Sequence, residues 1–400
     1  MTARSFVPPR RTLMGPGPSD VPTRVLEAMA RPTIGHLDPA FVALMDEIKE
    51  LLRYAFQTGA DLAIPVSGPG TAGMESCVVN LVRPGDVVVV CQNGVFGGRL
   101  KDMAARAGAE VVLVQDEWGR AIDPDGLRRA LAANPRANLV AFVQAETSTG
   151  AFSDVETLAR IAREHDCLTL VDTVTSLGGS PFRMDEWQVD AVYSGTQKCL
   201  SCAPGLSPIA LNQRAADRVR TRETPVQSWF MDLNLVLGYW GGGKRAYHHT
   251  APINALYGLH EALLILREEG LEAAWARHRR NHEALRAGLE VLGLRFIVPE
   301  SERLPQLNTV AIPEGVDDAR VRSYLLEAHG LEIGAGLGAL AGKIWRIGLM
   351  GYSSRPENIR LCITALADAL EKEGHRSSVA EALDAAESVL AAEPAGTTGG

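Results

Sequence analysis

CLTLVD, residues 167–172, is an apolar run that stops at an aspartate, and it is one of seven such runs between residues 60 and 212. Several of the runs are continuous rather than alternating, as expected for strands that are buried on both faces of a sheet. The other runs are LAIPVS (62–67), DVVVVC (86–91), EVVLV (110–114), NLVAFVQ (138–144), DAVYS (190–194) and LSPIAL (206–211).

Helix-length segments separate these runs, so strands and helices are expected to alternate. This alternation predicts an α/β fold with a mainly parallel, seven-stranded sheet sandwiched by helices. Proline is common in the first turn of a helix, and proline and glycine are common after its end. Pro124 starts one of these segments, and Pro84-Gly85 follows the end of another. The expected helices cover residues 71–82, 97–107, 124–133 and 155–164.

The remainder of the chain predicts a smaller α+β domain. Residues 213–260 look irregular, and two long helical patterns follow from about residue 254 to 292. Strands are expected at 294–298, 308–313, 331–336 and 344–350, and helices at 317–328 and 356–372. The predicted organisation is an N-terminal arm (1–20), a large domain (21–260), a small C-terminal domain (261–375) and a helical tail with a disordered end (376–400).

Composition and charge narrow the possible functions. The 400 residues carry a net charge of −8, which disfavours nucleic acid as a partner because phosphate backbones need a basic face. The sequence has no apolar run of about 18 residues and no charged-plus-apolar leader. We therefore expect a cytoplasmic protein that does not contact a membrane.

Two short motifs raise the question of metal or redox chemistry. Cys199-Leu-Ser-Cys202 is formally a C-x-x-C, but it lacks a second cysteine pair and a preceding βα start. His248-His249 has no carboxylate or cysteine cluster beside it in the sequence. We therefore expect no metal site, and we expect the six cysteines to be buried, reduced thiols.

Polar residues follow several of the apolar runs, at the points where the strands are expected to end. Because ligands of a parallel α/β sheet bind outside the carboxyl ends of its strands, these residues are candidates for a binding site. A glycine turn, an aromatic ring, an aspartate and a lysine together suit pyridoxal 5'-phosphate. The candidate segments are Ser67–Thr71, Asn93–Phe96, Glu146–Thr149, Asp172 and Ser194–Lys198.

Each candidate also has a structural interpretation. The turn Gly68-Pro-Gly70-Thr71 can cradle a phosphate at a helix N-terminus or simply join a strand to a helix. Phe96 can stack on a flat ring or belong to the core. Asp172 can pair with a pyridinium nitrogen or cap a helix, although Thr173–Thr175 begin a helix poorly. A lone Lys198 in a turn is usually structural, but beside an aspartate and a glycine turn it can be a nucleophile.

From about residue 13 to residue 370, the chain resembles the class V, fold-type I pyridoxal-phosphate aminotransferases, specifically the alanine/serine–glyoxylate aminotransferase group. The resemblance implies the fold type I of pyridoxal-phosphate-dependent transferases, pyridoxal 5'-phosphate as cofactor, and a homodimer with shared active sites. The motifs that carry it are LMGPGPS (13–19), SGPGTAGMES (67–76), NGVFGGR (93–99), ETSTG (146–150), LVDTVTSLGG (170–179), YSGTQK (193–198), YHHTAP (247–252) and GKIWRIGLMG (342–351).

Matched residue by residue, the family implies a role for each member of the site. Lys198 and Asp172 would be catalytic, with Lys198 bearing the cofactor and Asp172 meeting its pyridine nitrogen. Tyr247 and Thr250 would reach the phosphate bound in the neighbouring subunit. The remaining cofactor contacts would come from Gly70, Thr71, Phe96, Thr147 and Gln197, and the substrate contacts from Gly17, His36 and Arg346.

The resemblance implies a transaminase that moves the amino group of a small L-amino acid, alanine or serine, to glyoxylate or pyruvate by a ping-pong aldimine mechanism. The alternative is an (S)-ureidoglycine–glyoxylate aminotransferase of purine catabolism, which the chain resembles over DEWQVDA (185–191), GTQKCLS (195–201) and AGKIWRIGLMGYSSRPEN (341–358). That enzyme typically carries amide side chains where this sequence has His36 and Tyr247, which counts against ureidoglycine. The sequence leaves the exact donor, the acceptor and the direction open.

Three other functions fit the sequence less well. A cysteine desulfurase would need a mobile cysteine in the loop before Arg346, and residues 331–345 contain none. A cofactor-binding regulator would need an appended DNA-binding module, for which the chain has no spare length. A nucleotide-dependent dehydrogenase would need an acidic residue after a GxGxxG strand.

Overall fold

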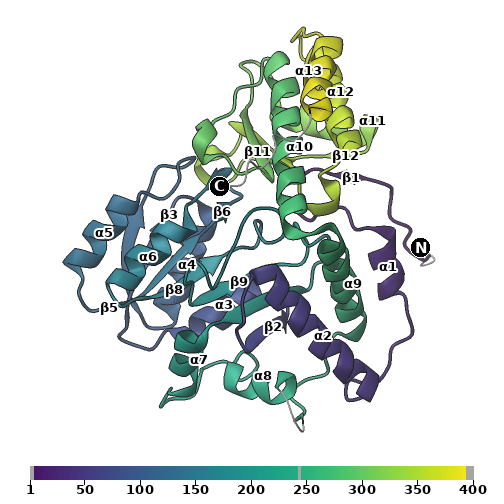
Figure 1. Ribbon diagram of the computed structural model, residues 1–400. Helices are drawn as coiled ribbons and strands as arrows, with labels where there is room; N and C mark the ends of the chain where they lie inside the picture. Colours follow the sequence, from purple (N-terminus) through teal and green to yellow (C-terminus); the bar gives the residue numbers. More distant parts are fainter. Residues whose placement is uncertain (1–3, 242–244, 393–400) are drawn as a thin grey trace.

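The computed structural model describes residues 4–241 and 245–392, and a seven-stranded sheet forms its centre (Figure 1). The strand order is β2-β10-β9-β8-β5-β3-β4, with β10 antiparallel to both neighbours and the other pairs parallel. Each predicted apolar run forms one strand, which confirms the mainly parallel sheet. The bounds are β2 (Leu62–Ser67), β3 (Val87–Gln92), β4 (Glu110–Gln115), β5 (Ala137–Val143), β8 (Leu168–Asp172), β9 (Ala191–Tyr193) and β10 (Leu206–Leu211).

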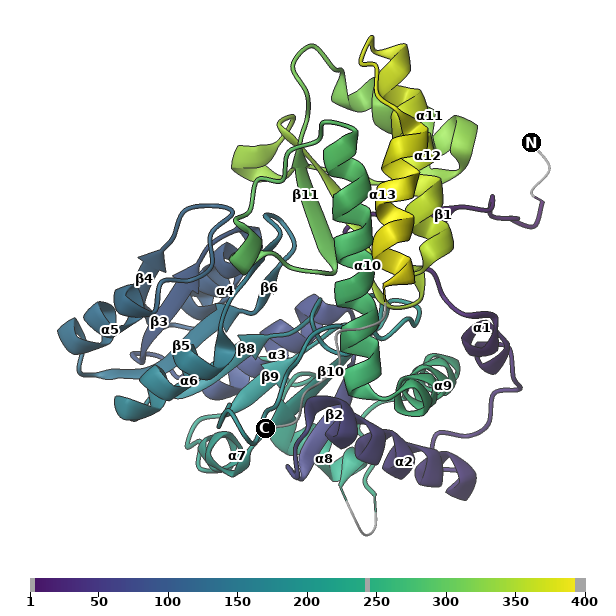
Figure 2. The ribbon, with the colours of Figure 1, turned by 45° about the horizontal axis from the view of Figure 1, so that its top comes forward.

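Helices flank this sheet (Figure 2), and all four helices predicted between its strands are present. Two of the flanking helices begin with an aspartate followed by proline, Asp38-Pro39 and Asp123-Pro124, and each aspartate accepts a backbone N–H of the first turn. The helices are α1 (Thr23–Met29), α2 (Pro39–Phe56), α3 (Gly70–Leu81), α4 (Val95–Arg106), α5 (Pro124–Ala133), α6 (Val155–Glu164) and α9 (Ile253–Glu269).

The prediction that residues 213–260 are irregular is wrong in two places. Helix α7 (Gln213–Arg220) and helix α8 (Leu233–Trp240) form there, in addition to the first turns of α9. The side chains of Asn212 and Asp232 cap these helices. The apolar residues of both helices pack into the hydrophobic core around the large sheet. Each helix has only eight residues, so its hydrophobic pattern is too short to identify it. The cap residues Asn212 and Asp232 were the sequence features that could have predicted where the two helices begin.

The C-terminal part of the chain forms an antiparallel sheet of β11 (Leu307–Ala311), β14 (Ile344–Gly348) and β13 (Gly334–Ala335). The predicted strand at 294–298 is wrong, because only Phe296 makes an isolated bridge, with Val310. Two further pairs are β1 (Thr12–Leu13) with β12 (Leu331–Glu332), and β6 (Ala145–Glu146) with β7 (Ala151–Phe152). The helices here are α10 (Leu271–Val291), α11 (Asp318–His329), α12 (Pro356–Lys372) and α13 (Val379–Ala391).

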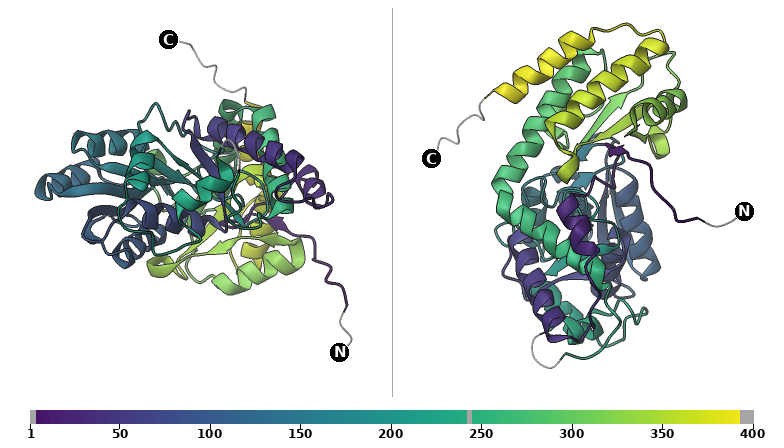
Figure 3. Two further views of the ribbon diagram at one scale, coloured as in Figure 1. Left: turned by 90° about the horizontal axis from the view of Figure 1, so that it is seen from below. Right: turned by 90° about the vertical axis from the view of Figure 1, so that its right-hand side faces the viewer.

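Two hydrophobic cores stabilise the two parts, one around the large sheet and one among the C-terminal helices and sheet. Helix α10 runs from the large sheet into the C-terminal part (Figure 3). It contributes Trp275 to the first core and Leu285 to the second. The tail helix α13 packs along α10 and α12 and buries Ala382 and Ala386. The predicted domain boundaries stay a prediction, and the predicted disordered end, residues 393–400, lies outside the described residues.

Candidate active site

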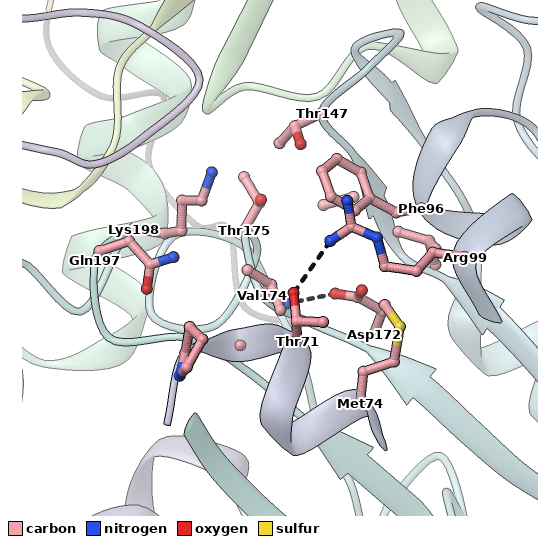
Figure 4. A pocket seen from close by; sticks show the side chains of 14 residues that line it. Thr71, Met74, Phe96, Arg99, Thr147, Asp172, Val174, Thr175, Gln197 and Lys198 are labelled. Carbon is pink, nitrogen blue, oxygen red and sulfur yellow. Dashed lines mark hydrogen bonds between the residues drawn. The ribbon is translucent and has the colours of Figure 1, made fainter. Parts of the chain in front are cut away.

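A cavity that is open to solvent lies where the sheet strands end at their carboxyl edge, and about 610 Å³ of empty space lies within it and its mouth (Figure 4). Its walls come from the starts of α3 and α4, the end of β8, and the loops that follow β6 and β9. A parallel sheet brings these segments together because all their strands end on the same side. The predicted cofactor-contact residues that line it are Gly70, Thr71, Phe96, Thr147, Asp172, Gln197 and Lys198.

Lys198 enters the cavity from the loop after β9, opposite Phe96 and Arg99 (Figure 4). Its side chain donates a hydrogen bond to the carbonyl of Pro16. Burial lowers the pKa of Lys198 to about 8, so a larger share of this amine is neutral near pH 7 than for an exposed lysine. Gly17 lies against the lysine with a φ of +99°, and a Cβ at this position would collide with the Lys198 side chain. Gly17 therefore lies beside Lys198, and its predicted contact with the substrate stays a prediction.

Asp172 ends β8 inside the cavity wall, with 3% of its surface exposed. Its Oδ2 accepts a hydrogen bond from the Tyr193 hydroxyl at 2.7 Å, and its Oδ1 accepts one from the backbone N–H of Val174 at 2.8 Å. Burial raises the pKa of this carboxyl to about 7. The residues that follow form turns, so Asp172 does not cap a helix. No role was predicted for Tyr193, although its place near the end of the DAVYS run puts it beside Asp172.

One end of the cavity presents hydrogen-bonding groups that have no partner within residues 4–241 and 245–392. Helix α3 begins at Gly70 without a side-chain cap, which leaves N–H groups of its first turn facing the cavity. Gln197 lines the same cavity, and its Oε1 is buried without a partner among the described residues. A helix N-terminus attracts an anion, and the Gln197 amide can present an N–H donor by rotating. This arrangement suits a phosphate group.

Arg99 also lines the cavity, and no role was predicted for it. Its guanidinium lies 5.0 Å from the centre of the Phe96 ring, and Nη1 donates to Thr71 Oγ1 at 3.0 Å (Figure 4). No carboxylate within the described residues forms an ion pair with it. The signal was present in the motif NGVFGGR, because residues three apart on a helix share a face.

Arg346 lies on β14, in the C-terminal sheet, and bridges to the loop of Thr147. Its Nη1 donates to the Thr147 carbonyl at 3.0 Å, and its Nε donates to the Ala335 carbonyl at 2.6 Å. Burial lowers the pKa of Arg346 to about 10. The guanidinium is thus held next to the cavity, with Nη2 free of hydrogen bonds to the described residues.

The predicted site residues that do not line this cavity are Gly17, His36, Tyr247, Thr250 and Arg346. The side chain of Tyr247 is 62% exposed, and its ring centre lies 5.2 Å from that of His36. Its hydroxyl is 3.5 Å from Thr250 Oγ1. Their predicted contacts with a bound cofactor or substrate stay predictions.

The histidines and cysteines considered in the sequence have structural partners. His248 stacks on Trp229 with ring centres 4.5 Å apart, and His249 Nε2 is 2.8 Å from Ser67 Oγ. Across the described ranges, no group of three metal-ligating side chains comes together. Cys199 donates to the Thr175 carbonyl, and burial raises the pKa of the Cys199 thiol to about 12. All six cysteines are buried and free.

The family model of class-V aminotransferases matches residues 12–359 of this sequence. The chain is a class-V aminotransferase. It is 42% identical to alanine–glyoxylate aminotransferase of Drosophila melanogaster, over 92% of this chain and 94% of that protein. It is 38% identical to (S)-ureidoglycine–glyoxylate transaminase of Bacillus subtilis, over 96% of each chain.

Solved structures give the same grouping for this class-V aminotransferase. The crystal structure of alanine–glyoxylate aminotransferase from Nostoc sp. matches with a TM-score of 0.90 and 49% identity, over 92% of this chain and 98% of that one. That of ureidoglycine–glyoxylate aminotransferase from Bacillus subtilis matches with a TM-score of 0.95 and 40% identity, over 97% and 100%. The predicted family and fold are therefore confirmed.

Class-V aminotransferases use pyridoxal 5'-phosphate, and the cavity residues fit this group. The uncapped start of α3 and the Gln197 amide suit its phosphate, and the Phe96 ring suits its flat pyridine. Asp172 would offer a buried carboxylate to a protonated ring nitrogen, and Lys198 would offer an amine to the aldehyde carbon. No helix in the described ranges combines the length and the apolar content that a membrane span requires.

Proposed function

We propose that this chain transfers the amino group of L-alanine or L-serine to glyoxylate or pyruvate, with pyridoxal 5'-phosphate held in the cavity described above. The observation that carries the proposal is the joint placement of Lys198 and Asp172 in one cavity with an uncapped helix start. The names of two relatives, the alanine–glyoxylate aminotransferases of Drosophila melanogaster and Nostoc sp., support the substrate class.

The proposed chemistry divides the work between cofactor and protein. When bound, pyridoxal phosphate supplies an electron sink for the charge that develops when an amino acid loses its α-proton. Asp172 would supply the negative charge that keeps the ring nitrogen protonated, and the Tyr193 hydroxyl orients that carboxylate. Lys198 takes and returns the proton at Nζ, and its lowered pKa suits a group that must act as both base and acid near neutral pH.

Arg346 is proposed to bind the carboxylate that the amino acids and 2-oxo acids share. Arg346→Lys will raise KM for alanine and glyoxylate by about 10- to 100-fold and change kcat less, because a lysine cannot offer the paired N–H groups of a guanidinium. Steady-state kinetics with both substrates measure this. Arg286→Lys, at an ion-paired arginine of α10, is the control and should change neither constant. An unchanged KM in Arg346→Lys would remove Arg346 from substrate binding.

(S)-Ureidoglycine is the second candidate donor. The match to the ureidoglycine–glyoxylate aminotransferase structure covers 97% of this chain, and the corresponding sequence match covers 96%. Against it stand His36 and Tyr247, which lie side by side and offer no amide group to a ureido substituent. We therefore favour alanine or serine.

A visible absorption spectrum of the purified protein tests cofactor and donor together. Bound pyridoxal phosphate colours the protein, and a competent donor bleaches the band as its amino group is transferred. We expect bleaching by L-alanine or L-serine, with recovery after glyoxylate is added. Bleaching by ureidoglycine alone would replace the proposed donor. A protein that stays colourless after incubation with pyridoxal phosphate would overturn the cofactor assignment.

We also propose that the protein is a cytoplasmic homodimer in which Tyr247 and Thr250 reach the partner's phosphate. Support comes from the exposed aromatic rings near this segment, with Trp229 62% and Phe230 38% exposed. Sedimentation equilibrium should give twice the chain mass, and a monomer that retains full activity would contradict the shared site.

A further inference from the structure

Glu146 is a fully buried carboxylate behind the cavity wall that accepts four hydrogen bonds from two elements. Its Oε1 accepts the Ser148 backbone N–H at 3.0 Å and the Ser148 hydroxyl at 2.6 Å. Its Oε2 accepts the N–H groups of Phe96 at 3.0 Å and Gly97 at 3.3 Å. Burial raises the pKa of Glu146, and all four donated hydrogen bonds act against this by favouring the ionised carboxylate.

Helix α4, which carries Phe96, depends on these groups for its start. The helix begins after Gly94, which has no side chain to cap it. Its first N–H, from Val95, donates to Ser148 Oγ at 2.9 Å, and the next two donate to Glu146. The N-terminal end of a helix also attracts negative charge. A segment after β5, about fifty residues away in sequence, therefore caps α4 and holds the backbone of Phe96 directly.

The same segment also forms part of the cavity wall itself. Thr147 lies between Glu146 and Ser148, lines the cavity, and accepts the Arg346 hydrogen bond through its carbonyl. The negative charge of Glu146 raises the pKa of Arg346 against the effect of burial, although no hydrogen bond joins the two side chains. Arg346 thus has a nearby opposite charge while Nη2 stays available for a substrate.

We propose that Glu146 is a positioning residue that holds Phe96, Thr147 and Arg346 in place around the cofactor. It contacts neither cofactor nor substrate, and it acts through the start of α4 and the Thr147 loop. Replacing its carboxylate would therefore weaken cofactor binding and carboxylate binding together. This inference rests on the proposed pyridoxal-phosphate site.

Glu146→Gln tests the proposal, with Asp190→Asn as a matched control. Asp190 is also a buried carboxylate that accepts a backbone N–H, from Thr169 at 3.0 Å, but it lies at the opposite edge of the sheet. The measurements are the pyridoxal-phosphate dissociation constant of the cofactor-free protein, the visible circular dichroism of the bound cofactor, and kcat and KM. Glu146→Gln should raise the dissociation constant and KM by about 10-fold and alter the dichroism, since the amide –NH₂ faces backbone donors.

Both variants should lose thermal stability, so stability alone does not decide between the two roles. Asp190→Asn should keep the dissociation constant and the dichroism of the unmodified protein. A Glu146→Gln protein that matches Asp190→Asn in these measurements would overturn the proposal. If the unmodified protein itself binds no pyridoxal phosphate, the proposed function fails instead.

Ser148→Ala provides a second test if Glu146→Gln does not fold. This variant keeps the Glu146 charge and removes the hydroxyl that links Val95 N–H to Glu146 Oε1. We expect a dissociation constant raised by about 3-fold with a smaller change in dichroism, because one neutral hydrogen bond contributes less than a charged one. An unchanged dissociation constant would overturn the proposal by this route as well.

Discussion

Lys198→Ala will lower kcat for transamination by about 10³- to 10⁴-fold or more, because it removes both the nucleophile and the group that moves the α-proton. No other lysine lines the cavity described by the structure. A methyl group in its place neither holds the cofactor covalently nor accepts a proton. Stopped-flow and steady-state assays with alanine and glyoxylate measure the loss.

Lys101→Ala is the matched control for this experiment. Lys101 lies exposed on α4, so its removal should leave kcat and the visible spectrum unchanged. A Lys198→Ala protein that retained a tenth or more of the activity would show that the proton moves through another group. The assignment of Lys198 would then be wrong, whatever the cofactor.

Asp172→Asn will lower kcat by about 10²- to 10³-fold, the size of loss seen when one fixed charge-stabilising group is removed from an active site. The amide oxygen can still accept the Val174 N–H that Oδ1 accepts. A neutral amide, however, does not keep a pyridine nitrogen protonated, and the Tyr193 hydroxyl then faces an –NH₂ group. Asp190→Asn, at a buried carboxylate away from the cavity, should keep kcat within about 2-fold. Equal losses in both variants would reduce Asp172 to a structural role.

Asp172→Asn should also change how the free energy of unfolding of the cofactor-free protein depends on pH. Burial raises the pKa of Asp172 to about 7 from an ordinary value of 3.8. Between these values the folded chain holds a proton that the unfolded chain releases, so the free energy of unfolding falls as the pH rises from about 4 to 7. In Asp172→Asn this fall should be shallower. Urea unfolding at several pH values measures it, and identical slopes would contradict the burial of an acidic Asp172.

Local pattern was enough to predict most of the fold. A continuous apolar run such as VVVVC needs burial on both faces, and only a parallel sheet covered by helices provides that repeatedly. The ends of such strands share one edge of the sheet, which is why the sequence predicts that Asp172 and Lys198 belong to one site. The family motifs then selected the cofactor and the fold type.

The short helices α7 and α8 were not predicted, because eight residues are too few to show a clear helical periodicity of apolar residues. Residues 294–298 were predicted to form a strand and do not, because an apolar run becomes a strand only where a neighbouring strand can pair with it along its length.

The sequence by itself determined the α/β class, the family and the residues that gather at the strand ends, because periodicity and motif spacing are properties of the chain. The tertiary structure decided the contacts between distant segments. It placed the Tyr193 hydroxyl on Asp172, the Thr147 carbonyl on Arg346, and the Glu146 carboxylate under the start of α4. These depend on how strands and helices pack in three dimensions, and no local pattern encodes which buried donor will meet which acceptor.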